Sequence, residues 1–252
     1  MTLTKKSLVL LLVLIFLALP SVAFAEETLL PSLNISIGEA EGPQEVASTL
    51  TLVLLLTILS LVPSILILAT AFTRIVIVLS LLRNAMGLQQ IPPNQVIIGL
   101  ALFLTIFVMA PVFVEVNNTA IQPYINEEIG FQEATQNALK PIREYMRNQT
   151  RKSDLDLFMQ MHGVASVPTV EDVPDYVLMP AYLISELKTA FQMGFVLFIP
   201  FLVIDMVVAS ILMSMGMMML PPVMISLPFK ILLFVMVDGW NIITRSLVLS
   251  FR

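Results

Sequence analysis

The sequence contains no cysteine and a single histidine, His162. Without cysteine the chain can form no disulfide, no thiolate nucleophile and no cysteine-based metal site. His162 has no second type of metal ligand clustered beside it and is interpreted as a surface or loop side chain. Few routes to acid–base or nucleophilic catalysis remain, and the sequence has no phosphate-binding loop, zinc-protease motif or nucleophile elbow. The sequence therefore predicts neither an enzyme nor a bound cofactor or metal.

Charge is also scarce. Charged residues make up 12% of the 252 residues, whereas a soluble domain carries roughly 25%. The formal net charge is −5 and no basic stripe is present, so nucleic acid is not an expected partner. Hydrophobic residues make up 58% of the chain, and its mean hydropathy is +0.93. This composition predicts an integral membrane protein.

The N-terminal 25 residues have the pattern of a secretory signal peptide. Lys5 and Lys6 form a positive region, residues 7–19 form a short apolar run, and Ala23-Phe24-Ala25 fits the small-residue cleavage pattern. We expect cleavage between Ala25 and Glu26; the alternative is an uncleaved anchor. Residues 26–49 then form an acidic, polar segment outside the cytoplasm.

Beyond residue 50 the sequence predicts an all-α protein with two apolar helical hairpins, residues 50–116 and 181–252, separated by a polar insert. Breaks are expected at Pro63 and Arg74. Starting outside, the two hairpins place both tight turns, near residues 88 and 221, on the cytoplasmic side. The insert, residues 117–180, is then periplasmic and is expected to hold an amphipathic helix.

Four charged residues interrupt the apolar stretches: Arg74, Asp205, Lys230 and Asp238. Counting about 1.5 Å of rise per residue from each turn places Arg74, Asp205 and Asp238 at one level and leaves Lys230 alone. Buried charges in a membrane usually pair, so we expect Arg74 to pair with Asp205 or Asp238, within one chain or between copies. The alternative is that these groups face water.

A methionine cluster lies at the second turn. Met217, Met218 and Met219 follow Gly216 and precede Pro221-Pro222, a pattern that ends a helix and favours a loop. Methionine is flexible, so three adjacent side chains could seal a passage and deform around a passing chain. The alternatives are a lipid-facing turn or simple gap filling. Small residues four apart, including Ser185 and Thr189, favour close helix packing and assembly.

Four segments carry a family resemblance. They are 72–84 (FTRIVIVLSLLRN), 89–95 (QQIPPNQ), 180–195 (PAYLISELKTAFQMGF) and 200–210 (PFLVIDMVVAS). They resemble the FliP family of the bacterial flagellar type III protein export gate, and the resemblance runs from about residue 50 to the end. It implies a channel subunit of the inner membrane at the flagellar basal body that passes unfolded flagellar subunits and performs no chemistry. It also implies that Met217, Met218 and Met219 form the pore-closing gasket.

The resemblance further implies specific partners. Family members form a pentamer that assembles with FliQ and FliR into a closed helical ring. FlhA and FlhB complete the export apparatus, and FliO assists assembly in many species. Two other functions compete with this one. An ion- or proton-coupled transporter would use Asp205 and Arg74 as a relay, but two hairpins are few and no inverted repeat is visible. An intramembrane enzyme would need the nucleophile or histidine pair that the chain lacks.

Overall fold

The computed structural model describes residues 43–88, 90–163, 173–217 and 219–251. The predicted signal peptide, the cleavage site at Ala25 and Glu26, and Met218 lie outside these residues. The chain divides into two units, residues 1–51 and 52–252. In the first unit the described residues, 43–51, are helical and form the beginning of α2.

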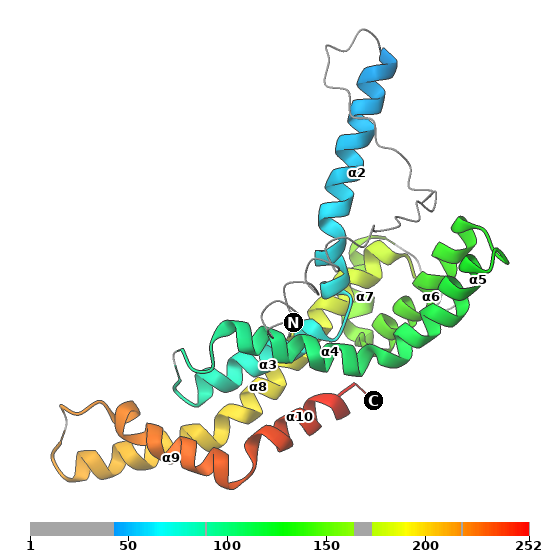
Figure 1. Cartoon of the computed structure of the whole chain (residues 1–252). Helices are drawn as coiled ribbons and strands as arrows, with labels where there is room; N and C mark the ends of the chain where they lie inside the picture. The colour runs from blue at the N-terminus through cyan, green and yellow to red at the C-terminus, as the bar shows by residue number, and fades with distance from the viewer. Residues whose placement is uncertain (1–42, 89, 164–172, 218, 252) are drawn as a thin grey trace, which may run out of the picture. The chain divides into compact units, whose positions relative to one another are not determined.

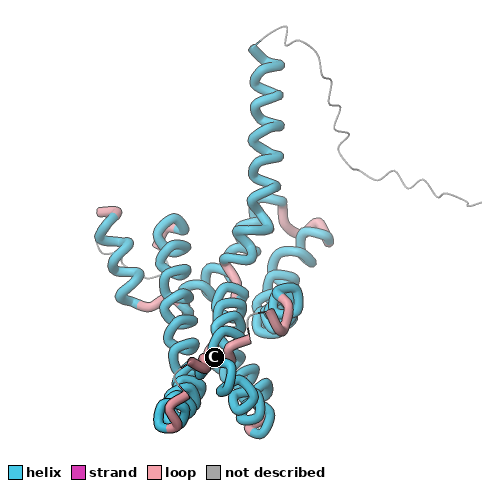
Figure 2. Tube along the Cα trace, turned by 90° about the vertical axis from the view of Figure 1, so that its left-hand side faces the viewer, coloured by secondary structure: helices cyan, strands magenta, loops and turns pink. Residues whose placement is uncertain are grey.

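Every regular element of the described residues is a helix, as predicted, and none is a strand (Figures 1 and 2). The second unit contains the rest of α2 and the other elements. The helices in chain order are α2 (Pro43–Leu68), α3 (Phe72–Ala85), α4 (Asn94–Val116), the short π-helix η1 (Asn117–Ile121), α5 (Gln122–Ile125), α6 (Phe131–Gln149), α7 (Lys152–Met161), α8 (Asp175–Ser214), α9 (Pro222–Met236) and α10 (Gly239–Leu249).

The first long apolar stretch breaks at a different place from the one predicted. Pro63 lies inside α2 and Arg74 inside α3, and the helix is interrupted between them at residues 69–71. Ala69 and Ala71 are buried there, and the hydroxyl of Tyr182 donates a hydrogen bond of 2.8 Å to the carbonyl oxygen of Thr70. A tertiary contact therefore satisfies a carbonyl at the break, which sequence spacing alone does not reveal.

Two helical segments are long and apolar enough to cross a membrane, Asn94–Ile125 and Asp175–Ser214. The first runs through α4, η1 and α5, and the second is α8. The pair α9 and α10 would make a third span if taken together, but it is bent by 66° at its break. The depth estimate for Asp238, counted from the turn near residue 221, had assumed no such bend.

Helix α8 is the central element of the second unit, because it packs against α3, α6, α7 and α9 (Figure 1). One hydrophobic core joins α3 and α4 to α8, α9 and α10, with Ile75, Leu82 and Leu247 among its most buried members. A second core joins α6 and α7 to the first half of α8. The predicted polar insert therefore packs directly on the same long helix that enters the second apolar hairpin.

Candidate functional site: buried charge clusters and the methionine loop

Arg74 on α3 is the most completely bonded charged residue among those described. Its Nε donates to Oε2 of Glu186 at 3.0 Å, and its Nη2 bonds Oε1 of the same carboxylate. Nη2 also donates to Gln149 Oε1 at 3.0 Å, and Nη1 donates to the carbonyl oxygen and hydroxyl of Ser250 at 2.8 and 3.1 Å. All five guanidinium donors are thereby used. The side chains of Arg74 and Glu186 are 2% and 0% exposed, so the ion pair is inside the protein.

The surroundings of Arg74 tie four helices together. The guanidinium lies 4.0 Å from the ring centroid of Phe251, and Gln149 donates a hydrogen bond to the Phe251 carbonyl. Tyr145 and Tyr182 pack edge to face nearby, with ring centroids 6.2 Å apart. Burial, and then the negative charge of Glu186, raise the pKa of Tyr145 well above its usual value. The site is a packed, neutralised junction of α3, α6, α8 and the end of α10.

The predicted partners of Arg74 were wrong. Within the chain Arg74 pairs with Glu186, and neither Asp205 nor Asp238 contributes to its site. The prediction considered only the charges of Arg74, Asp205, Lys230 and Asp238, and it estimated depth along straight helices. Helix α8 instead begins at Asp175 and carries Glu186 into the apolar region. The carboxylate that pairs with Arg74 therefore belongs to a residue that the depth estimate had not included.

Asp205 belongs to a second cluster. Lys230 on α9 donates to Oδ2 of Asp205 at 2.6 Å, and the Ser226 hydroxyl donates to Oδ1 at 2.5 Å. Lys230 Nζ also lies 3.3 Å from the carbonyl oxygen of Ala85 at the end of α3, where a cation is favoured by the helix dipole. Lys230, predicted to be alone, thus joins α8, α9 and α3. The spacing of Ser226 and Lys230, four residues apart on α9, could have shown that both lie on one face of that helix.

A third cluster fastens α7 to α8. Asp154 accepts hydrogen bonds from Lys188 and from the Ser185 hydroxyl, the latter at 2.9 Å. The Ser185 hydroxyl also accepts from the backbone N–H of Arg151 at 3.0 Å. Burial alone would raise the pKa of Asp154. The hydrogen bonds from Lys188 and Ser185 and the charges of Lys188 and Arg151 outweigh it, so the pKa lies below its usual value.

Asp238 has a backbone role. It lies between α9 and α10 with a left-handed φ of 52°, which is uncommon for a residue other than glycine. Gly239 follows, and the ring of Phe234 packs so closely on it that an added Cβ would lie 2.3 Å from a ring atom. Trp240 meets Phe234 edge on, with ring centroids 5.4 Å apart. These contacts fix the bend between the two helices.

Met217 and Met219 lie in a loop between α8 and α9, and Met218 lies outside the described residues. Helix α8 ends at Ser214, Gly216 takes a φ of 75°, and α9 begins at Pro222. Met217 is half-buried, whereas the side chain of Met219 is 99% exposed. The neighbouring Met213, Met215 and Met224 are also exposed. A single chain thus presents flexible apolar side chains at this turn without covering them.

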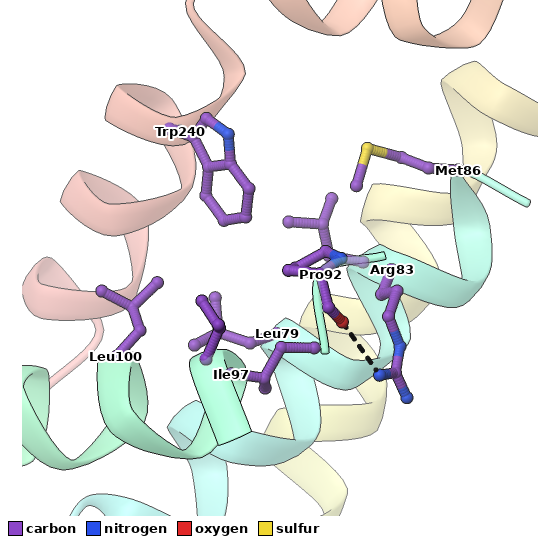
Figure 3. Close-up of a pocket in the computed structure, with 9 residues that line it drawn as sticks. Leu79, Arg83, Met86, Pro92, Ile97, Leu100 and Trp240 are labelled. Carbon is purple, nitrogen blue, oxygen red and sulfur yellow. Dashed lines mark hydrogen bonds between the residues drawn. The ribbon is translucent and has the colours of Figure 1, made fainter. Parts of the chain in front are cut away.

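An apolar cavity of about 160 Å³ lies at the other turn (Figure 3). The residues that contribute to its wall include Leu79 of α3, Met86 directly after α3, Ile97 and Leu100 of α4, and Trp240 of α10. Arg83 borders it and donates hydrogen bonds to the Pro92 carbonyl at 3.3 Å and to Asn94 Oδ1 at 2.5 Å. Arg83 therefore fastens the turn between α3 and α4.

A sequence model of the FliP family matches residues 55–247 of this chain. The match covers more than half of the chain, including Arg74, Glu186, Asp205 and Lys230. The chain belongs to the FliP family. Its members take part in flagellar type III protein export and are not known as enzymes. Within the described residues, no group of three or more histidine, aspartate or glutamate side chains could hold a metal ion.

Relatives called "Flagellar biosynthetic protein FliP" align over most of the chain. The protein from Bacillus subtilis is 58% identical over 217 residues, which are 86% of this chain and 98% of the relative. That of Caulobacter vibrioides is 50% identical over 93% of this chain and 86% of its own. That of Aquifex aeolicus is 48% identical over 88% of this chain and 92% of its own. The resemblance found in the sequence is thus confirmed along nearly the full length of these FliP proteins.

Proposed function

We propose that this chain is a channel subunit of the flagellar type III export gate, through which unfolded flagellar subunits cross the inner membrane. In this role it forms a homo-oligomeric ring, a pentamer by family resemblance, together with FliQ and FliR. FlhA and FlhB are the further expected partners, and FliO is expected to assist assembly. The chain itself catalyses no reaction.

One observation carries this proposal beyond family membership. The long helices α4 and α8 expose large apolar side chains, such as Phe103 (75% exposed) and Phe195 (70% exposed), while their charged neighbours pair inside the chain. Exposed apolar faces of this extent need lipid or other subunits to cover them. The ion-coupled transporter is less well supported, because Arg74 and Asp205, the two ends of its relay, lie in separate clusters.

The proposed topology places the insert (residues 117–180) and the mature N-terminus in the periplasm, and the turns near residues 88 and 221 on the cytoplasmic side. Cleavage after Ala25 removes the signal peptide. N-terminal sequencing of the assembled protein should then begin at Glu26, and an intact Met1 would contradict this step.

Native mass measurement of the chain co-expressed with FliQ and FliR tests the assembly. We expect one large complex containing several copies of this chain. A monomer or dimer that binds neither partner would favour the transporter instead.

The gasket role of Met217, Met218 and Met219 belongs to the same proposal. Several copies of this loop around a ring would bring thioether side chains together, and a dry apolar constriction blocks ions. Replacing all three methionines with alanine should leave assembly intact and make the inner membrane leaky to ions. The control variant carries alanine at Met213 and Met224, two methionines near the loop that are not part of the proposed gasket. Unchanged permeability of an assembled triple variant would show that the seal lies elsewhere.

A further inference from the structure

Helix α10 carries a polar stripe on its outward face. Asn241 and Arg245 are four residues apart on α10, which places them on one side of the helix, and Asp238 directly precedes the helix as its N-cap residue. All three side chains are exposed. Their backbones bond within the helix and its first turn, but none of the three side chains makes a hydrogen bond or ion pair with another residue in the described part of the chain. Asp238 and Arg245 are seven residues, or about 10 Å of helical rise, apart, so they do not reach one another.

The orientation of this stripe is fixed by packing. Ile243 and Leu247, on the opposite side of α10, are 4% and 0% exposed in the core shared with α3. At the start of the helix, Gly239 is held against the ring of Phe234. Rotating α10 to hide the stripe would expose the core residues and break both contacts. The stripe therefore points away from the core wherever the chain is placed.

The stripe stands out against its surroundings. Ile242 and Leu249 flank it and are exposed and apolar, as are the outward side chains of α4. A charged side chain at the centre of a hydrocarbon layer costs about 2.5–3.5 kcal/mol on insertion scales, so two unpaired charges favour water or a polar partner. In a second copy Asp205 and Lys230 already bond each other and Arg74 and Glu186 are buried, so these four charges are not free to pair with the stripe.

We propose that Asp238, Asn241 and Arg245 line the water-filled passage of the assembled channel. This rests on the proposed function, since a single copy encloses no passage. The surface fits a hydrated, extended polypeptide. An acidic, an amide and a basic group along one line can exchange hydrogen bonds with backbone and side chains of either charge. None of them presents an apolar surface on which a passing chain would be retained.

Thiol labelling tests this directly, because the chain has no cysteine of its own. Single variants Asn241→Cys and Arg245→Cys are assembled with FliQ and FliR and treated with a membrane-impermeant, negatively charged methanethiosulfonate reagent. Both thiols should react as readily as an exposed thiol of the insert, such as Gln132→Cys. The matched control Ile242→Cys, which is also at an exposed position in the single chain, should react about tenfold more slowly in the complex, because neighbours or lipid cover it.

The outcomes distinguish an error in the placement of the stripe from an error in the proposed function. Complexes of normal mass in which Asn241→Cys and Arg245→Cys react as slowly as Ile242→Cys would overturn the inference and place the stripe at a subunit interface. Failure of the unmodified chain to assemble would instead contradict the proposed function. If Arg245→Cys fails to fold, Asn241→Cys still decides, since it removes no charge. A bulky adduct at Asn241→Cys should also reduce export, whereas the same adduct at Ile242→Cys should not.

Discussion

Arg74 shows how one residue can make a buried site that tolerates little change. Removing one member of a buried ion pair leaves the other charge uncompensated, at a cost of roughly 3–5 kcal/mol. Either Arg74→Met or Glu186→Gln should therefore strongly reduce the amount of folded protein recovered in mild detergent. The double variant should lose less than the sum of the two, because the charges are then both absent.

Asp205→Asn provides the control for this cycle. Asp205 bonds Lys230 rather than Arg74, so combining Asp205→Asn with Arg74→Met should give additive losses. If the loss of folded protein in Arg74→Met were instead reduced by Asp205→Asn and not by Glu186→Gln, the result would support the Arg74–Asp205 pair that the sequence had suggested.

The single residue Asp154 makes the folding stability of the chain depend on pH. Its pKa is lower in the folded chain than the ordinary value of about 3.9 that it has when unfolded. Its contribution is therefore fully present above about pH 4 and is lost as the pH falls through the folded pKa. Thermal unfolding should show Asp154→Asn to be less stable than the unmodified chain at pH 7, with the difference shrinking below pH 4. A constant difference down to pH 2 would contradict this.

The bend between α9 and α10 is the clearest case at the scale of elements. An alanine at Gly239 would place Cβ 2.3–2.8 Å from three atoms of the Phe234 ring, and Phe234 is itself packed against Trp240. Overpacking of this kind typically costs about 1–3 kcal/mol. Gly239→Ala should lower the thermal midpoint, and adding Phe234→Leu should recover part of the loss.

Gly99→Ala is the matched control for this prediction. Gly99 lies inside α4 with nothing within 4 Å of an added Cβ, so alanine there should be neutral or stabilising. Equal losses at the two glycines would show that the contact with Phe234 is not the cause.

The helical class and the loop at Gly216 and Pro221 follow from local sequence, because apolar length, proline and glycine act over a few residues. The break at residues 69–71 does not, since it depends on Tyr182, which lies 112 residues from Thr70. The pairing of Arg74 was missed for the same reason. Glu186 sits at a border between polar and apolar sequence, and only the register of α8 against α3 decides which side it joins.

At the scale of the whole molecule, Leu139 on α6 tests whether the insert contacts a neighbouring copy. Met146 on α6 is buried against α7 and α8 and Ile142 is partly buried there, whereas Leu139 is 40% exposed. Leu139→Asp should therefore leave the single chain folded and targeted to the membrane while reducing the yield of oligomer, if this face contacts a neighbouring copy. The measurement is the ratio of oligomer to single chain on native gels.

Asn137→Asp adds the same charge on nearly the opposite side of α6, and it should leave the oligomer intact. An undiminished oligomer in Leu139→Asp would show that this part of the insert remains in water.

The 112 residues that separate Arg74 from Glu186 also impose an order in time. Ribosomes add about 5–20 residues per second, so Arg74 is made roughly 6–22 s before its counter-charge exists. During that interval the first hairpin carries an unpaired guanidinium. A nascent chain stalled before residue 186 should be extractable from the membrane by mild denaturant, and one stalled after α8 has emerged should resist. Such a nascent chain would need to be stabilised by another protein until α8 has been synthesised. The synthesis of α8 is therefore the first step on which assembly of the channel depends.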